Sequence, residues 1–199
     1  MARLYLASAS PRRAELLRQL GVPFRHLLPP DIDETPRLQE SPADYVIRMA
    51  AEKAAVGVAT RPEGGHEALV LGADTSVVLD ESILGKPEDR AQAVAMLTAM
   101  SGREHRVISA VCVSNGQQLW QAISETHVTF RALSRDEILR YVDTGEGADK
   151  AGGYGIQGFG AALVERLAGS YSGVVGLPLA ETSQLLEAAG IRIWQTPEA

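Results

Sequence analysis

Short apolar runs alternate with amphipathic stretches along the whole chain, without internal repeats. Residues 4–7 predict a buried strand, and a helix should follow because Ser10 is a favourable N-cap and Pro11 suits the first helical position. Residues 68–79 form an almost unbroken apolar run, which predicts a buried strand or two strands that meet at Gly72. This alternation is typical of an α/β fold.

A hairpin is predicted in the second half of the chain. Residues 107–114 and a β-rich segment that ends near residue 133 flank Asn115-Gly116, a favourable two-residue turn. Because a hairpin pairs its strands antiparallel, the sheet should be mixed, with helices packed against it. The chain offers no linker, so residues 1–199 are expected to form a single domain. Further expected elements are helices that begin near Ser41, Pro87, Ser134 and Pro178, and a last strand over residues 191–194.

Composition and charge narrow the function classes. The net charge of -6 disfavours a general nucleic-acid-binding protein, whose affinity depends on basic surface. No apolar run approaches the roughly 20 residues of a membrane-spanning helix, and the first residues lack the apolar stretch of a signal peptide. We therefore expect a cytoplasmic protein with no membrane or nucleic-acid partner. The single cysteine, Cys112, lies among apolar residues and is expected to be a buried strand thiol.

Two cations stand where helix physics disfavours them. Arg12 and Arg13 would occupy the first turn of the predicted helix, where the macrodipole favours Asp or Glu. The free N–H groups of that turn, the hydroxyls of Ser8 and Ser10 and the two guanidinium groups together indicate a site for an anion. The alternative is that both arginines point into solvent or pair with Glu15.

One carboxylate, Asp74, lies within the apolar run of residues 68–79, where an unpaired charge is costly. Such a group is usually a metal ligand, a general base or half of a buried ion pair, and a turn cap is a further alternative. Lys53 falls late in the preceding predicted helix, and Lys86 stands at a predicted turn before Pro87. Either lysine alone would be a surface charge. Together with the two arginines and the buried carboxylate, they indicate one site for a polyanion.

Residues 145–160 are rich in glycine and are not expected to form regular structure. Gly153, Gly155 and Gly158 match the spacing Gly-x-Gly-x-x-Gly of dinucleotide-binding proteins, but that motif should follow a strand and open a helix. Here a loop precedes the motif and a β-prone segment follows it. We instead expect a loop whose backbone closely approaches a ligand and which presents Gln157.

These segments, in this order, resemble the Maf family from about Leu4 to Leu186. The resemblance implies an elongated α/β fold with a central cleft between two lobes. It also implies hydrolysis of nucleoside triphosphates to monophosphate and pyrophosphate, with a divalent metal cation, Mg²⁺ or Mn²⁺, as cofactor. The segments that carry the resemblance are Ala7-Ser-Ala-Ser-Pro-Arg-Arg13, Glu52-Lys-Ala54, Gly72-Ala-Asp-Thr75, Gly85-Lys-Pro87, Asp149-Lys-Ala-Gly-Gly-Tyr-Gly-Ile-Gln-Gly158 and Val175-Gly-Leu-Pro178.

The resemblance also implies roles for individual residues. Asp74 is similar to the family's catalytic acidic residue, which is either a general base for water or a metal ligand. Glu34 resembles a second acidic residue linked to the metal. The phosphate-handling positions correspond to Ser8, Arg12, Arg13, Lys53 and Lys86, and the base-discriminating positions of the pyrimidine-preferring branch correspond to Arg12, Thr75 and Gln157.

Uridine and thymidine triphosphates are the expected substrates. Uracil and thymine present an N3–H donor beside carbonyl acceptors, and one carboxamide can answer both, whereas cytosine reverses the pattern. Gln157 would then read the base, unless it only caps its glycine loop. Two other functions stay open: a pyrophosphatase for 7-methyl-GTP or modified nucleotides, and a non-catalytic nucleotide sensor that affects septum formation. The sequence permits a homodimer without settling the oligomeric state.

Overall fold

The computed structural model describes residues 4–27, 32–62 and 68–194. None of the helices in these ranges is both long and apolar enough to cross a membrane. The strands are β1 (Leu4–Ala7), β2 (Arg25–Leu27), β3 (Leu69–Leu79), β4 (Ser82–Leu84), β5 (Glu104–Ser114), β6 (Leu119–Phe130) and β7 (Val164–Ala168). The α-helices are α1 (Pro11–Gln19), α2 (Pro42–Thr60), α3 (Arg90–Met100), α4 (Arg135–Asp143), α5 (Tyr171–Val175) and α6 (Leu179–Ala188).

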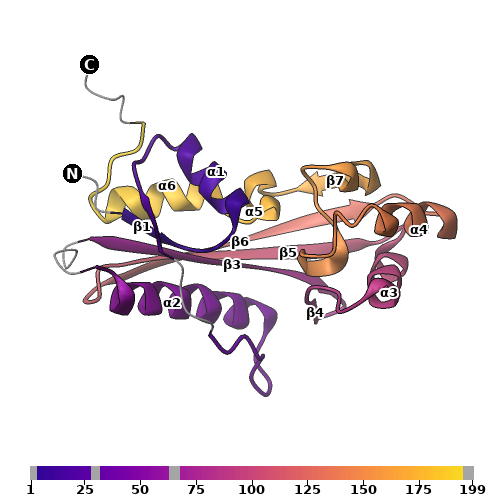
Figure 1. The fold of residues 1–199 in the computed structure, drawn as a ribbon, viewed down its shortest axis with the longest axis horizontal. Coiled ribbons are helices and arrows are strands. Elements are labelled where there is room, and N and C mark those ends of the chain that lie inside the picture. Colours follow the sequence, from indigo (N-terminus) through magenta and orange to yellow (C-terminus); the bar gives the residue numbers. More distant parts are fainter. Residues whose placement is uncertain (1–3, 28–31, 63–67, 195–199) are drawn as a thin grey trace.

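The strands of the described residues form one mixed sheet in the order β2-β1-β3-β5-β6-β7, with β4 paired to β3 outside this path. β1 is parallel to both β2 and β3, and the other pairs are antiparallel. β5 and β6 form the hairpin that Asn115-Gly116 predicted. The long strands β3, β5 and β6 run along most of the molecule (Figure 1). The prediction of a mixed α/β fold is therefore confirmed.

Two groups of helices pack at opposite ends of this sheet (Figure 1). At one end α2 covers one face, and α1, α5 and α6 cover the other. α3 and α4 lie with β7 at the far end. Each end has its own apolar cluster, one that includes Leu17 and Leu71 and another that includes Met100 and Phe130. The result is an elongated molecule with two lobes built on a continuous sheet, as the resemblance implied.

A close contact between the backbone of α2 and the sheet is made at Gly72 of β3. A Cβ atom at this position would lie 2.5 Å from the backbone nitrogen of Ala54 and would also overlap the carbonyl oxygen of Ala50. These two atoms belong to neighbouring turns of α2, so the helix backbone rests directly on the glycine. Lys53 and Asp74 flank this contact in sequence. The glycine therefore sets the distance between the two elements that carry them.

The predicted last strand, residues 191–194, is not a strand. This segment follows α6 as irregular chain, and the N–H of Trp194 donates to the carbonyl oxygen of Leu20 at 2.7 Å. Ile191 and Ile193 pack against the apolar cluster beneath α1 and α6. The alternation of apolar residues that suggested a strand thus reflects packing on the helices and not pairing in the sheet.

The structure differs from the predicted elements in two further ways: one helix begins later, and three short elements were not predicted. α3 begins at Arg90, three residues after the predicted start at Pro87, because Asp89 is its N-cap and accepts a hydrogen bond from the N–H of Gln92 at 2.8 Å. The elements β2, β4 and α5 were not predicted. Each has three to five residues, which is too few for a periodic pattern to stand out.

The contact at Gly72 generates a stability prediction. Gly72→Ala should lower the free energy of unfolding by about 1–3 kcal/mol, since the added methyl group meets helix backbone that cannot rotate away. Gly85→Ala is the matched control, because a Cβ atom there meets nothing within 4 Å, and it should change stability by less than about 1 kcal/mol. Urea denaturation of both variants measures this. Equal stabilities of the two variants would contradict the close packing of α2 on β3.

Candidate active site

A cleft of about 1060 Å³ opens between the two lobes. It lies beside a gap in the sheet: β1 pairs with residues 69–71 of β3 and β4 pairs with residues 77–79, so residues 72–76 have no strand partner on that side among the described strands. Asp74 and Thr75 lie in this gap. All the site residues predicted from the sequence line the cleft: Ser8, Arg12, Arg13, Glu34, Lys53, Asp74, Thr75, Lys86 and Gln157.

The first turn of α1 forms one wall of the cleft. The Ser10 hydroxyl caps the helix by accepting a hydrogen bond from the N–H of Arg13 at 3.4 Å, and Pro11 follows as the first helical residue, as predicted. The Ser8 hydroxyl accepts from the N–H of Ser10 at 3.2 Å. No acidic residue stands in this turn. The positive end of the helix therefore faces the cleft with two arginines beside it, which is an arrangement suited to an anion.

Arg13 is held at the back of the cleft by three segments of the chain. Its Nε donates to the carbonyl oxygen of Gly176 at 2.8 Å, and its terminal nitrogens donate to the hydroxyls of Ser8 and Thr75, each at 3.4 Å. The Thr75 hydroxyl also lies 2.8 Å from that of Ser109. Burial lowers the pKa of Arg13, and the attraction of the nearby Asp74 carboxylate opposes that shift. The solvent-exposed alternative for Arg13 is therefore wrong.

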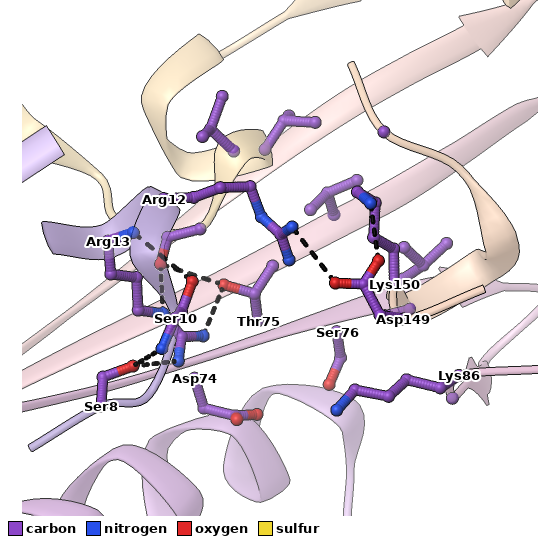
Figure 2. A pocket seen from close by; sticks show the side chains of 18 of the residues that line it. Ser8, Ser10, Arg12, Arg13, Asp74, Thr75, Ser76, Lys86, Asp149 and Lys150 are labelled. Atoms are coloured by element: carbon purple, nitrogen blue, oxygen red, sulfur yellow. Dashed lines mark hydrogen bonds and ion pairs between the residues drawn. The ribbon is translucent and has the colours of Figure 1, made fainter. Parts of the chain in front are cut away.

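Arg12 and Lys86 approach the cleft from opposite sides. Figure 2 shows Arg12 on the α1 side of the cleft and Lys86 on the opposite side. A terminal nitrogen of Arg12 lies 3.5 Å from a carboxylate oxygen of Asp149, in the glycine-rich loop across the cleft. Lys86 follows β4, and its loop is held because the N–H of Gly152 donates to the carbonyl oxygen of Gly85 at 3.0 Å. Positive charge thus lines both sides of the cleft.

Two carboxylates share one ammonium group at the centre of the site. Lys53 Nζ lies 2.7 Å from Oδ1 of Asp74 and 2.8 Å from Oε1 of Glu34. Asp74 is only 8% exposed, so the buried ion pair that the sequence left open is present. Partial burial raises the pKa of Glu34, but the hydrogen bond and the charge of Lys53 outweigh it, so this pKa lies below its ordinary value. Glu34 is therefore ionised at neutral pH.

These two carboxylates also determine how well the site suits a metal ion. Among the described residues no group of three or more His, Cys, Asp and Glu side chains is placed to hold a metal. Mg²⁺ usually takes one or two carboxylates together with water and substrate phosphate oxygens, and does not need a complete protein cage. The pair of Glu34 and Asp74 fits that donor set, provided that phosphate supplies further oxygens.

The glycine-rich loop is fixed by a carboxylate that the sequence did not single out, Glu146. Its oxygens accept hydrogen bonds from the Tyr141 hydroxyl at 2.9 Å and from the backbone N–H groups of Phe159 and Gly160 at 2.7 and 2.8 Å. A Cβ atom at Gly158 would overlap the Glu146 carboxylate. Glycine is therefore needed there for close packing, while the charge of Glu146 organises the loop.

The loop presents Gln157 to the cleft. Its side chain is exposed, and within the described part of the chain its carboxamide has no hydrogen-bond partner. Glu146, not Gln157, satisfies the loop's own N–H groups. The loop contains two short 3₁₀ segments and leads into β7 without opening an α-helix, so the dinucleotide-binding interpretation stays excluded. The alternative that Gln157 caps its loop is not supported.

A buried cluster of aromatic rings holds Tyr154 of the same loop against the sheet. The Tyr154 hydroxyl lies 2.8 Å from Nε2 of His105 on β5, and both rings pack edge-on against Phe130. Burial lowers the pKa of His105 to about 4, so this histidine is neutral at pH 7. Tyr154 lines the cleft, but nothing in its sequence context distinguished it from a core tyrosine.

Comparison with known proteins yields one family and a set of closely similar relatives. Residues 3–189 match the model of the family described as Maf-like protein. A "dTTP/UTP pyrophosphatase" of Alcanivorax borkumensis is 61% identical over 193 residues, which cover 96% of this chain and 98% of the relative. Proteins with the same name from Methylobacillus flagellatus and Cereibacter sphaeroides are 53% and 50% identical; the alignments cover 97% and 96% of this chain and 96% and 97% of those relatives.

Proposed function

The chain belongs to the Maf-like protein family, and we infer that it is a nucleoside triphosphate pyrophosphatase that hydrolyses dTTP and UTP to the monophosphate and pyrophosphate. This inference rests on one observation: all the site residues predicted from the sequence line one cleft. The relatives aligned over nearly the whole chain are named dTTP/UTP pyrophosphatases, which favours this activity over the alternatives of 7-methyl-GTP hydrolysis and nucleotide sensing.

The cations of the cleft suit pyrophosphate as a leaving group. We propose that the first turn of α1, with Ser8, Arg12 and Arg13, binds phosphate oxygens from one side, and that Lys86 binds them from the other. Attack of water on the α-phosphorus breaks the bond to the bridging oxygen, which leaves with the β- and γ-phosphates. Fixed positive groups lower the barrier when they face the oxygens on which charge develops. The hydrogen bonds of Arg13 hold it in place before the substrate arrives.

We propose Mg²⁺ or Mn²⁺ as the cofactor, held by Glu34 and Asp74 together with phosphate oxygens. A bound divalent ion would supply positive charge at the phosphate being attacked. Lys53 contacts the same two carboxylates, so its positive charge offsets their mutual repulsion when they hold no metal. Lys53 Nζ occupies only Oδ1 of Asp74 in the described contacts. The second oxygen, Oδ2, is then the atom that can orient the water and accept its proton.

We propose that the pyrimidine base is read by Gln157, with Arg12 and Thr75 shaping the same end of the cleft. The unpaired carboxamide of Gln157 offers one donor and one acceptor, which match the N3–H and a carbonyl of uracil or thymine. Thr75 is already bonded to Ser109 and Arg13, so it contributes as part of a rigid wall. A cytosine in this position would leave buried polar groups unpaired, at a cost of about 1–3 kcal/mol each.

We also propose that the enzyme works in the cytoplasm, where its nucleotide substrates are found. The net charge of -6 argues against nucleic acid as a partner. The absence of a membrane partner, the homodimer and the single-domain organisation stay predictions from the sequence.

The role of Asp74 leads to a prediction for Asp74→Asn. This change keeps the size of the side chain but removes the charge that would accept a proton or bind metal, so kcat with dTTP should fall by about 10² or more. The variant should remain folded, which circular dichroism can verify. Near-normal turnover with a lowered melting temperature would instead assign Asp74 to a purely structural ion pair with Lys53.

A nucleotide panel tests substrate choice and base recognition together. With Mg²⁺ the wild type should convert dTTP and UTP to monophosphate and pyrophosphate with the highest kcat/KM among dTTP, UTP, CTP, GTP and 7-methyl-GTP, and a chelator should stop turnover. Gln157→Glu should lower the ratio of kcat/KM for dTTP to that for CTP by about tenfold, since a carboxylate only accepts hydrogen bonds.

Gln117→Glu is the matched control, because it makes the same change at an exposed position of the β5–β6 turn. Its ratio should equal that of the wild type. A wild-type preference for 7-methyl-GTP would contradict the proposed substrate, and an unchanged ratio in Gln157→Glu would remove this residue from the base site.

A further inference from the structure

The loop that carries Glu34 has no regular secondary structure, yet it holds the Glu34 carboxylate in a defined position. Residues 32–41 contain no helix or strand, and residues 33–39 are exposed. Even so, the loop places the Glu34 carboxylate 2.8 Å from Lys53 Nζ. A loop of this kind needs contacts outside itself to hold one conformation, because ordering each residue costs about 1–2 kcal/mol of backbone entropy.

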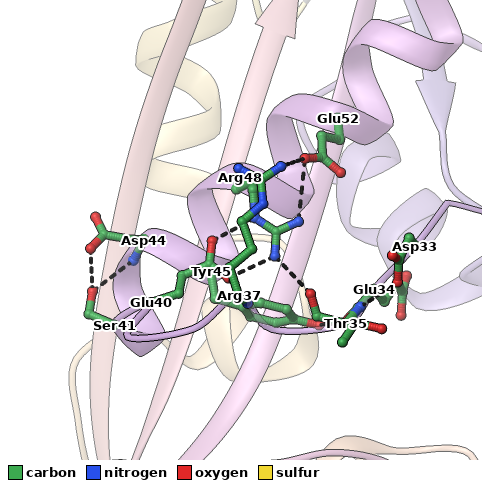
Figure 3. A network of polar contacts seen from close by, with 10 residues as sticks. All are labelled: Asp33, Glu34, Thr35, Arg37, Glu40, Ser41, Asp44, Tyr45, Arg48 and Glu52. Atoms are coloured by element: carbon green, nitrogen blue, oxygen red, sulfur yellow. Dashed lines mark hydrogen bonds and ion pairs between the residues drawn. The ribbon is translucent and has the colours of Figure 1, made fainter.

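One ion pair fastens the far end of this loop to α2 (Figure 3). Arg48 Nε lies 2.5 Å from Oε1 of Glu40, and a terminal nitrogen lies 2.7 Å from Oε2, so the pair is bidentate. The two side chains are only 13% and 8% exposed. The hydrogen bond from Arg48 lowers the pKa of Glu40 to about 2. A bidentate pair shielded in this way fixes orientation as well as distance.

Arg48 and its neighbour on α2 also hold the loop next to Glu34. A terminal nitrogen of Arg48 donates to the carbonyl oxygen of Thr35 at 3.1 Å, and the Tyr45 hydroxyl donates to that of Glu34 at 2.9 Å. The Arg48 guanidinium lies over the Tyr45 ring, 5.5 Å from its centroid. One arginine therefore binds the loop at two points after Glu34, namely Thr35 and Glu40, and also packs on the tyrosine that holds the Glu34 backbone.

One hydrogen bond within the loop also ends on the Glu40 carboxylate, and a second joins the same two residues. The N–H of Arg37 donates to Oε2 of Glu40 at 2.9 Å, and the N–H of Glu40 donates to the carbonyl oxygen of Arg37 at 3.1 Å. Glu40 thus closes a turn within the loop and binds Arg48 at the same time. Lys53 stands on α2 five residues after Arg48, so the helix that holds the loop also carries the cation that Glu34 meets.

We propose that Glu40 and Arg48 are positioning residues for the reaction: their ion pair, the Glu40–Arg48 clamp, holds Glu34 beside Lys53 and Asp74 for metal and phosphate binding. This role rests on the proposed function, because it matters only if Glu34 serves catalysis. Neither residue lines the cleft, so neither touches the substrate. The clamp acts through the loop alone, and its loss should matter only as far as Glu34 is misplaced.

A double-mutant cycle tests this dependence. Glu40→Gln keeps the shape of the side chain and removes its charge, and it should lower kcat/KM for dTTP by about 10- to 100-fold through a misplaced Glu34. In an enzyme that already carries Glu34→Gln, the same change should have almost no further effect, because its target is gone. Losses that multiply in the double variant would overturn the proposal, as would full activity of Glu40→Gln.

Hydrogen exchange gives a readout that does not depend on activity. In Glu40→Gln the amides of residues 33–41 should exchange at least several-fold faster than in the wild type, while β3 and β5 stay protected. The matched control is Asp143→Asn, which breaks an exposed bidentate pair with Arg90 away from the cleft. It should change neither exchange in the loop nor kcat/KM. Unchanged exchange of the loop in Glu40→Gln would overturn the clamp.

Arg48→Lys provides a second variant if Glu40→Gln folds poorly. Lysine keeps the positive charge but cannot form the planar fork or reach Thr35 and Glu40 together, so the loop should again exchange faster and kcat/KM should again fall. The outcomes also separate the two proposals. A wild type that releases no pyrophosphate would overturn the proposed function, and the exchange measurements would still decide whether the clamp holds the loop.

Discussion

The cleft depends on the sharing of one ammonium group, Lys53 Nζ, by the carboxylates of Glu34 and Asp74. Two negative charges placed this close would repel each other without a cation between them. The three side chains come from a loop, a helix and a strand, so each of those elements must be placed accurately. Gly72 does so for α2 and β3 by allowing direct backbone contact. The gap between β1 and β4 then leaves Asp74 accessible to a ligand.

The rest of the cleft is organised in the same way, with polar groups fixed before any substrate binds. Arg13 connects α1, β3 and the turn at Gly176, and Glu146 binds the N–H groups of the glycine-rich loop. A phosphate transfer site gains most when its charges need not reorganise during reaction. Substrate phosphates would meet an Arg13 that is already held in place, and the exposed Gln157 would be left to select the base.

The site residues that could be recognised from the sequence are those whose type conflicts with their local surroundings. Asp74 in an apolar run and two arginines in a first helical turn both contradict local preference, and both lie in the cleft. By contrast, Glu40, Arg48 and Glu146 are ordinary polar residues in their local sequence, and their partners become clear only in the fold. Residues 191–194 show the opposite error, since their alternation fits a strand but Ile191 and Ile193 pack against an apolar cluster and pair with no strand of the described sheet. The family resemblance supplied the expectation of a cleft and of a metal-linked role for Glu34, which local pattern alone did not.

The central claim is that water attacks the α-phosphorus and pyrophosphate leaves. Hydrolysis of dTTP in water enriched in oxygen-18, followed by mass spectrometry of both products, tests it most directly. The account predicts one heavy oxygen in the dTMP and none in the pyrophosphate, because the cations of the cleft stabilise the pyrophosphate as it departs. Label in the pyrophosphate would show attack at the β-phosphorus, and release of orthophosphate with dTDP as the first products would show cleavage at the γ-phosphate. Either result would contradict the account.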